Sequence, residues 1–297
     1  MQNLSTVLAT RNEEANIGLC LESIKTIADE IIVVDEYSTD KTREIAESYG
    51  AKVFLEPHHP IFHITKQKAL ERATGDWILQ IDADERLTPE LAKEIEEVIN
   101  MTDEQIRNRK IDPVKQKLFD RHQKLIERRD PAFAKSFGGH GGPIVAFFIP
   151  RVNMFLGKPL IHAGVYPDPS IRLVKKGKAH FPAKSVHEIM QVDGEVAWLG
   201  NAMKHHDSPT LSRYLKRMNR YTDLKAQELE NSKTPKNLLY LLIYSSIKPL
   251  FVFLNLYIRH KGFLDGLHGF LWSFLSAMHY PIAYFKFWKS NLAYNSK

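Results

Sequence analysis

The sequence predicts an α/β fold built on a doubly wound, mostly parallel sheet and followed by a helical C-terminal extension. Strand-like runs at Leu4–Ala9, Glu30–Val34 and Trp77–Ile81 are typical of buried parallel strands. Segments with apolar residues at helical spacing separate these runs, and such alternation indicates a parallel sheet. Polar residues follow each run at once, and sheets of this kind bind ligands at the carboxyl ends of their strands.

Capping and turn residues indicate where the helices between these strands begin and end. Ser38-Thr39-Asp40 supplies helix-capping side chains, and Gly50 is suited to end the helix that follows. No Gly-x-Gly-x-x-Gly follows the first strand, which argues against a dinucleotide-binding domain. The expected order after the first strand is helix Asn16–Ile27, strand Glu30–Val34, helix Lys41–Tyr49, strand Ala51–Leu55, helix Ile64–Ala73 and strand Trp77–Ile81.

The stretch Gly75–Arg86 is the centre of the predicted site. Its strand stops in Asp82, Asp84 and Glu85, and carboxylates this close together need a counter-charge. A hard cation such as Mg²⁺ or Mn²⁺ supplies one, and it would bridge to the phosphate oxygens of a nucleotide. On an extended backbone the Asp-x-Asp spacing turns both carboxylates to the same side. The alternative is a polar strand-to-helix turn, with Thr88 starting the next helix.

Composition narrows the classes of partner and compartment. The 297 residues carry a net charge of +6, which favours an anionic partner such as phosphate groups, an acidic membrane or nucleic acid. The single cysteine, Cys20, excludes an intramolecular disulfide, fits a reducing compartment and is expected in the core. The N-terminal segment has no basic region followed by a long apolar run, so we expect no signal peptide and a cytoplasmic catalytic part.

Several polar positions in the second half are candidates that also have an ordinary interpretation. Arg172 lies in an apolar run and could be a surface strand residue. Glu188 lies in SVHEIM, where partial desolvation raises the pKa of a carboxyl toward that of a useful base; an edge-strand pair with Lys184 is the alternative. The pair His205-His206 could ligate a metal, although adjacent histidines more often cap a helix start.

The order of these motifs resembles a known enzyme family. TVLATRNEEANI, IIVVDEYSTDKT and GDWILQIDADERL are similar to the GT-A domain of inverting family 2 glycosyltransferases. In the second half, PRVNMFLGKPLIHAGVYPDPSIRLVKKGKAHF, SVHE, LKRMNRYT and GFLDGLHGF resemble the branch that contains lipopolysaccharide-core β-1,4-glucosyltransferases. The resemblance covers about residues 4–100 and 147–290. Two positions depart from it: Glu36 replaces a small residue, and Val165 stands where the branch often has Trp.

The resemblance implies roles for individual residues. Glu188 would be the catalytic base, with His187 as its rival, and His187 and Arg172 would contact phosphate or acceptor. Asp84, with Asp82 and His206, would hold Mg²⁺ or Mn²⁺. Asp35 and Glu36 would hold the nucleoside base or ribose, and Arg11 and Lys66 would bring positive charge. The full set expected at the nucleotide-sugar donor is Thr10, Arg11, Glu13, Asp35, Glu36, Lys66 and Asp82.

The chain is expected to divide into a GT-A domain over residues 1–210 and C-terminal helices over 211–297. Residues 101–146 lie outside the resemblance; their Lys- and Arg-rich sequence predicts a helical hairpin followed by the flexible loop Gly138–Gly142. A charge-rich helix of this kind is usually a solvated face. A membrane-facing or acceptor-facing surface is the second interpretation.

The C-terminal part contains the apolar stretches Leu238–Ile258 and Leu267–Trp288. Their length would permit a transmembrane hairpin, but Lys248 would then lie in mid-bilayer and Arg259 on the far side, against the positive-inside tendency. Basic and aromatic residues around apolar faces favour helices that lie in an anionic membrane interface. Packing of these helices as ordinary core is the remaining alternative.

The resemblance therefore predicts an enzyme that moves a sugar, such as glucose, from a UDP-sugar to a lipid-linked or lipopolysaccharide-type acceptor. Its place would be the cytoplasmic face of the inner membrane, as a monotopic protein with no nucleic acid partner. A polyprenyl-phosphate glycosyltransferase is the nearest alternative. Two rivals from other classes remain. A sugar-phosphate nucleotidylyltransferase would show a glycine-rich loop after the first strand, which TRNEEAN lacks, and a non-catalytic membrane scaffold would have little reason to keep acids at three strand ends.

Overall fold

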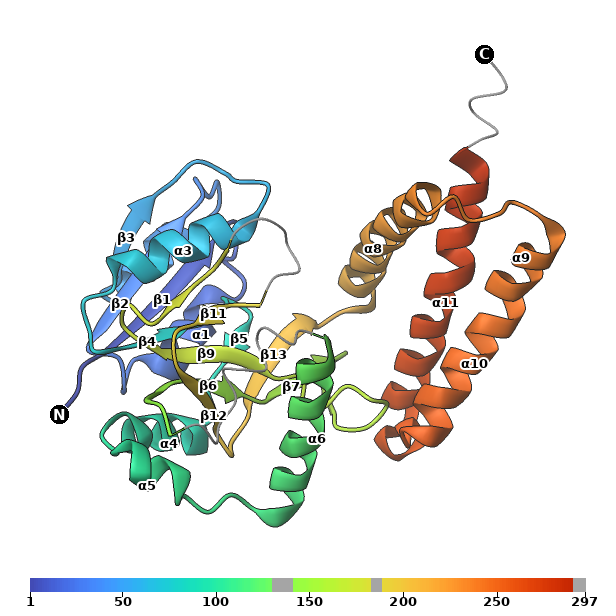
Figure 1. Cartoon of the computed structure of the whole chain (residues 1–297). Coiled ribbons are helices and arrows are strands. Elements are labelled where there is room, and N and C mark those ends of the chain that lie inside the picture. The colour runs from blue at the N-terminus through green and yellow to red at the C-terminus, as the bar shows by residue number, and fades with distance from the viewer. Residues whose placement is uncertain (130–140, 183–188, 291–297) are drawn as a thin grey trace. The chain divides into compact units, whose positions relative to one another are not determined.

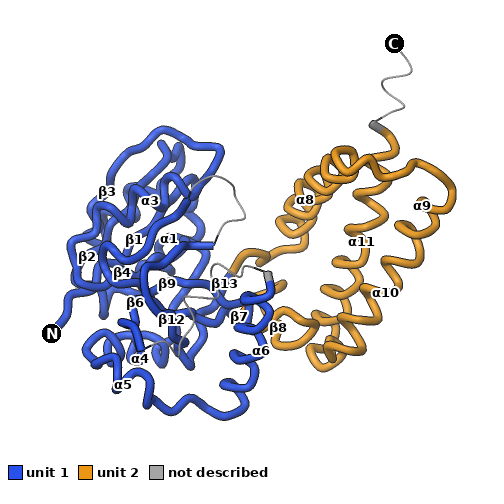
Figure 2. The backbone as a smooth tube through the Cα atoms, in the orientation of Figure 1, with its two compact units in different colours: residues 1–151, 167–205 blue, residues 152–166, 206–297 orange. Residues whose placement is uncertain are grey.

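The computed structural model describes residues 1–129, 141–182 and 189–290, and the described residues divide into two compact units (Figure 2). Unit 1 comprises residues 1–151 and 167–205, and unit 2 comprises residues 152–166 and 206–297. Segment 152–166 therefore clusters with the C-terminal helices, although the sequence analysis placed it in the first domain.

Within the described residues of unit 1, seven strands form one sheet in the order β12-β6-β9-β4-β1-β2-β3 (Figure 1). Neighbours among β1, β2, β3 and β4 are parallel, as are β6 and β12, whereas β9 runs antiparallel between β4 and β6. The predicted doubly wound, mostly parallel sheet is confirmed. The strands are β1 Leu4–Thr10, β2 Glu30–Asp35, β3 Lys52–Leu55, β4 Trp77–Gln80, β6 Ile144–Ile149, β9 Ser170–Lys175 and β12 Glu195–Trp198.

Helices cover both faces of this sheet. Successive strand residues point to opposite faces, so Leu8 of β1 joins one apolar cluster of unit 1 while its neighbour Val7 joins another. The first cluster includes Leu21 of α1 (Ile17–Ile24), and the second includes Leu70 of α3 (Phe62–Arg72). The remaining helices of this part are α2 Thr42–Ser48 and α4 Pro89–Ile99.

The insertion predicted over residues 101–146 forms helices between residues 103 and 129, whereas its residues 144–146 belong to strand β6. A capping box at Thr102 starts α5 (Asp103–Arg107), and α6 (Pro113–Arg129) follows. Phe119 of α6 stacks on Trp198 with ring centroids 4.5 Å apart, so this helix packs on the second apolar cluster. Residues 130–140, which include most of the predicted loop Gly138–Gly142, lie outside the described residues.

Short strands complete unit 1. Glu85 and Arg86 form β5, which pairs antiparallel with the start of β13 (Met203–Ser208), so that Glu85 lies opposite His205. This pairing brings the acids after β4 next to His205. The other short pair is β10 Ala179–His180 with β11 Gln191–Val192.

Unit 2 combines a strand hairpin with long helices. Strands β7 (Arg151–Phe155) and β8 (Lys158–Leu160) form the hairpin, and Phe155 and Leu160 pack with Tyr214 and Met218 of α8 (Leu211–Asn231). A second cluster joins α8 to the helices that follow. The later elements are α9 Leu238–Leu242, a π-helical turn Ile243–Ile247, α10 Lys248–Leu254, a π-helical turn Asn255–Arg259, a 3₁₀ turn Gly262–Asp265 and α11 Gly266–Ser290.

The continuous helix over residues 238–259 packs one side on α11 and exposes many of its other apolar side chains. Among the described residues, it alone is long and apolar enough to cross a membrane, with a mean hydropathy of 1.6, yet only 11% of its apolar window is buried. Most of this apolar window therefore lies outside the described core of unit 2. Lys248, its central charge, is half-buried and lies 3.6 Å from the centre of the Tyr244 ring. The exposed apolar residues are Leu238, Leu239, Leu242, Ile247, Leu250, Phe251, Leu254 and Ile258.

Candidate active site

Asp35 joins the carboxyl ends of β1 and β2. It pairs with Thr10 in the parallel register, and Thr10 Oγ1 donates to its Oδ2 at 2.9 Å. Ser38 donates twice, from its backbone N to Oδ1 at 2.7 Å and from Oγ to Oδ2 at 2.6 Å. Because the Asp35 side chain is fully buried, these bonds satisfy a carboxylate that has left water. Asp35 thus ties the end of β1 to the turn that follows β2.

Glu36, the next residue, is also held by protein groups. Thr65 Oγ1 donates to its Oε1, and His58 Nδ1 lies 2.5 Å from its Oε2. Only 7% of Glu36 is exposed. The Glu36 carboxylate, which was expected to hold the nucleoside, therefore links the end of β2 to α3.

The loop after β1 presents Arg11 at the surface. Asn12 has a φ of +54°, and Glu13 donates from its backbone N to Thr42 Oγ1 at 2.7 Å. Asn16 Nδ2 donates to Glu13 Oε2 at 2.7 Å, so this carboxylate closes the start of α1. Arg11 is exposed between these anchors. Thr10, Arg11 and Glu13 accordingly lie together at the carboxyl end of β1.

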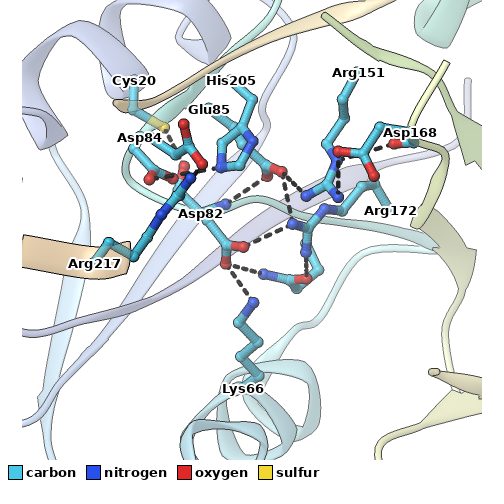
Figure 3. A network of polar contacts seen from close by, with 12 residues as sticks. Cys20, Lys66, Asp82, Asp84, Glu85, Arg151, Asp168, Arg172, His205 and Arg217 are labelled. Atoms are coloured by element: carbon cyan, nitrogen blue, oxygen red, sulfur yellow. Dashed lines mark hydrogen bonds and ion pairs between the residues drawn. The ribbon is translucent and has the colours of Figure 1, made fainter. Parts of the chain in front are cut away.

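Asp82, directly after β4, lies between buried cations (Figure 3). Lys66 Nζ of α3 is 2.5 Å from its Oδ1, and Arg172 Nη2 of β9 is 2.7 Å from its Oδ2. Burial raises the pKa of the Asp82 carboxyl, but Arg172 and Lys66 outweigh burial and hold that pKa well below its usual range. Asp82 is therefore a carboxylate whose charge is already balanced.

Arg172 extends this pairing into a chain of alternating charges. Its Nη2 donates to Glu85 Oε1 at 2.6 Å, and Arg151 Nη1 donates to the same oxygen at 3.2 Å. Arg151 Nη2 lies 2.9 Å from Asp168 Oδ2. Burial disfavours the charged guanidinium of Arg172, yet Asp82 and Glu85 prevail and raise its pKa above the usual value. The alternative interpretation of Arg172 as a surface strand residue is wrong: Arg172 is 4% exposed and holds the acids after β4 in place.

Asp84 has different surroundings. Residues 83 and 84 form a turn instead of the extended backbone expected from the Asp-x-Asp spacing, and Asp84 Oδ2 lies 3.7 Å from His205 Nε2 (Figure 3). His206 is the ligand expected from the sequence, whereas the histidine beside Asp84 is His205. Adjacent strand residues present their side chains to opposite faces. Strand alternation through Met203–Ser208 was the signal that could have separated the two histidines.

These groups suit a hard divalent cation that is shared with phosphate. The described residues contain no cluster of three or more His, Cys, Asp or Glu side chains able to hold a metal by themselves. Mg²⁺ at phosphate sites is usually bound by one or two carboxylates together with substrate oxygens and water. Asp84, with His205 beside it, provides such a partial donor set, so the residues fit a cation that arrives with a diphosphate.

Cys20 lies under the same turn as a packing residue. It is fully buried in the first apolar cluster, and its Sγ donates to the Asp82 carbonyl oxygen at 3.5 Å. Burial, with further contributions from Glu85 and Asp84, raises the pKa of the thiol well above its usual value. The prediction that this cysteine is core is confirmed. Glu188 and His187, the predicted base and its rival, lie outside the described residues and stay predictions.

The model of the family described as "Glycosyl transferase family 2" matches residues 5–155, which is just over half of the chain and includes Asp35, Asp82 and Asp84. The chain belongs to glycosyl transferase family 2. This family 2 member is therefore a glycosyltransferase, and the predicted family and enzyme class are confirmed.

Two relatives of this family 2 glycosyltransferase differ in sequence identity and in the length of chain that matches. The lipopolysaccharide core biosynthesis glycosyltransferase LpsC of Rhizobium meliloti is 28% identical over 292 residues, which cover 92% of this chain and 90% of LpsC. An uncharacterized glycosyltransferase of Rickettsia bellii is 48% identical over 96 residues, about a third of either chain. Among solved structures, glucosyl-3-phosphoglycerate synthase from Mycobacterium tuberculosis in complex with Mn²⁺, UDP-glucose and phosphoglyceric acid is 17% identical. That alignment covers 80% of this chain and 81% of the other, with a TM-score of 0.42.

Proposed function

We propose that this glycosyltransferase moves a hexose such as glucose from a UDP-sugar to a lipid-linked or lipopolysaccharide-type acceptor, with inversion at the anomeric carbon. One observation supports binding of a UDP-sugar donor. At the carboxyl edge of β1, β2 and β4 the structure groups Asp35, Lys66, Asp82 and Asp84. Ligands of doubly wound sheets bind at this edge. The similarity to LpsC over nine tenths of the chain supports a lipopolysaccharide-type acceptor.

The donor would be held mainly by groups that complement a nucleoside diphosphate. Arg11 is exposed at the end of β1 and Lys66 is a buried cation, and both are suited to phosphate oxygens. Thr10, Asp35 and Glu36 fix the backbone around the nucleoside through their mutual hydrogen bonds. Asp84, with His205, would hold Mg²⁺ or Mn²⁺. Such an ion would offset the charge that develops on the leaving diphosphate.

Glu188 is proposed as the base that accepts the proton of the acceptor hydroxyl. That hydroxyl attacks the anomeric carbon from the face opposite the diphosphate, which produces inversion. A hydroxyl is a weak nucleophile at neutral pH, so a positioned carboxylate is worth about a hundredfold to ten-thousandfold in rate. His187 stays the rival for this role, with Glu188 preferred from the family position.

The acceptor is proposed to reach the enzyme from the cytoplasmic face of the inner membrane. Helix 238–259 exposes a row of leucine, isoleucine and phenylalanine side chains, and unpartnered apolar faces of this kind bind lipid. Lys236, Arg259 and Lys261 lie at its two ends, where they would meet anionic headgroups. The same feature supports a polyprenyl-phosphate acceptor as the second candidate.

The decisive experiment incubates the full-length enzyme with Mn²⁺, a panel of nucleotide sugars and each acceptor class in turn. We expect UDP release to require one sugar donor and to rise with truncated lipopolysaccharide. NMR of the product should show an anomeric configuration opposite to that of the donor. Faster transfer to polyprenyl phosphate than to lipopolysaccharide would select the second candidate. Absence of transfer from every donor, with the protein folded, would overturn the proposal.

A further inference from the structure

The Lys66–Asp82 pair differs from every other link in the chain of alternating charges (Figure 3). Arg172 is fixed by the carboxylates of Asp82 and Glu85 and by Gln80 Oε1, and its side chain is 5% exposed on a central strand. Lys66 has a long flexible stem on α3, and Asp82 is the only acceptor that the described residues offer to its ammonium group. The other neighbour of this group is the Phe62 ring, 5.0 Å from Nζ to the ring centre.

The Lys66 ammonium group therefore has N–H donors without an acceptor among the described residues. It carries three N–H donors, and a buried cation with a single carboxylate partner is poorly compensated. Its side chain is 9% exposed, and burial, with a smaller contribution from Arg172, lowers the pKa of Lys66 below its usual value despite the neighbouring Asp82 carboxylate. Phosphate oxygens of a donor at this edge would supply the acceptors that are missing. Arg172 differs from Lys66, because Gln80, Asp82 and Glu85 already accept hydrogen bonds from its Nη1 and Nη2 groups and only its buried Nε lacks an acceptor.

We propose that Lys66 changes partner when the donor binds and leaves Asp82 for the diphosphate. Asp82 Oδ1 then keeps only the hydrogen bond from Gln80 Nε2 at 3.1 Å and is open to a divalent cation. This inference rests on the proposed function. In the free protein Lys66 and Arg172 already balance Asp82, so a further cation meets repulsion from Lys66. Movement of Lys66 to phosphate removes that repulsion. Lys66 is thus the element that couples metal affinity to nucleotide affinity, and such coupling is reciprocal.

The test measures Mn²⁺ affinity of the full-length protein with and without UDP, using the EPR signal of free Mn²⁺. In the wild type we expect UDP to raise Mn²⁺ affinity by tens of fold, within the usual range of about 5–150-fold for coupled sites. In Lys66→Met, Mn²⁺ affinity without UDP should rise about tenfold, because the competing cation is gone. The coupling factor should fall by a similar amount, and UDP affinity without metal should also fall.

Lys68→Met is the matched control. Lys68 lies on the same helix, but it pairs with Glu56 at 2.6 Å, away from Asp82, so all three quantities should match the wild type. Lys66→Gln, which keeps a hydrogen-bond donor without the charge, should behave as Lys66→Met. Circular dichroism and thermal unfolding establish that each variant is folded.

Unchanged or weaker Mn²⁺ binding by folded Lys66→Met and Lys66→Gln without UDP would overturn the inference, since Lys66 would then be a fixed support for Asp82. The failure of the proposed function looks different. In that case the wild type itself would bind neither UDP nor Mn²⁺ and would transfer no sugar. A wild type that transfers sugar, together with Lys66 variants that keep its coupling factor, removes only the inference.

Discussion

Arg172 Nη2 lies 2.6 Å from Glu85 Oε1, and neither side chain is more than 5% exposed. This ion pair connects the middle of β9 to the short strand β5. Glu85 Oε2 also accepts the backbone N–H of Asp82 at 2.9 Å, so the same carboxylate closes the turn that carries the acids after β4. The geometry of the candidate metal and phosphate site thus depends on a carboxylate that water does not reach.

Glu85→Gln should destabilise the protein strongly. Removal of one partner from a buried ion pair typically costs about 3–5 kcal/mol, and here Arg172 and Arg151 both lose a counter-charge. Urea denaturation monitored by tryptophan fluorescence measures the loss. Asp193→Asn is the control: its pair with Lys178 is largely exposed and screened by solvent, so we expect almost no change in stability. Equal stability of Glu85→Gln and wild type would show that the pair is dispensable.

Asp84→Ala should abolish the dependence of UDP binding on Mn²⁺ or Mg²⁺ while the protein stays folded. Without the Asp84 carboxylate, the proposed metal site loses its negatively charged protein ligand. Isothermal titration calorimetry with and without metal measures the effect. His205→Ala should weaken the metal-linked affinity more than His206→Ala does, because His205 is the histidine beside Asp84. Metal-linked UDP affinity that persists in Asp84→Ala would remove this assignment.

Glu188→Gln should lower sugar transfer by about a hundredfold to ten-thousandfold while UDP-sugar binding stays near that of the wild type. Glutamine keeps the shape and hydrogen bonding of the side chain but cannot accept the proton. Transfer rates and donor affinities of Glu188→Gln and His187→Ala, measured side by side, separate the two candidates. If His187→Ala loses transfer with intact binding and Glu188→Gln does not, the base is His187.

Glu30 makes the free energy of unfolding depend on pH in the acidic range. Burial raises the pKa of its carboxyl, but hydrogen bonds from Lys52, Ser5 and Thr74 outweigh burial and lower that pKa to about 2. A depressed carboxyl pKa stabilises the fold fully above its unfolded value, near 4.5, and the stabilisation is lost as the pH falls toward 2. The difference in unfolding free energy between wild type and Glu30→Gln should therefore shrink between pH 4.5 and 2. Chemical denaturation at several pH values checks this, and a constant difference would contradict it.

Leu250→Asp combined with Phe251→Asp should release the protein from lipid vesicles. These side chains are 60% and 68% exposed, and burial of each in a membrane is worth about 1.5–3 kcal/mol. The double variant should therefore bind vesicles of phosphatidylethanolamine and phosphatidylglycerol at least about a hundredfold more weakly in flotation assays. Leu19→Asp alters a side chain of unit 1 that is 56% exposed and should not change flotation. Wild-type protein that never floats would refute interfacial attachment.

Local signals in the sequence were sufficient for the first half of the fold. The strands through Trp77–Gln80 and their helices lie within a few residues of their expected positions, because buried parallel strands and capped helices have short-range patterns. The antiparallel insertion of β9 between β4 and β6 was not predictable in this way. Strand order depends on pairing between residues about a hundred positions apart, which periodicity does not encode.

The same division holds for the site. The importance of Asp82 and Asp84 follows from acids that end a buried strand. The partners of Asp82 come from α3 and β9, and the Arg172–Glu85 pair joins residues 87 positions apart, so composition and spacing could not supply them. The assignment of Asp35 and Glu36 to the nucleoside left out their neighbours, which in the structure occupy both carboxylates.

The segment 152–166 has a practical consequence for preparing a catalytic fragment. Its strands β7 and β8 lie between two stretches of unit 1 in the sequence, but they bury Phe155 and Leu160 against helices of unit 2. A stop codon after residue 205 would leave this hairpin with its apolar side uncovered, and the product would be expected to aggregate. A fragment for crystallisation needs a second edit that replaces 152–166 with a short polar linker.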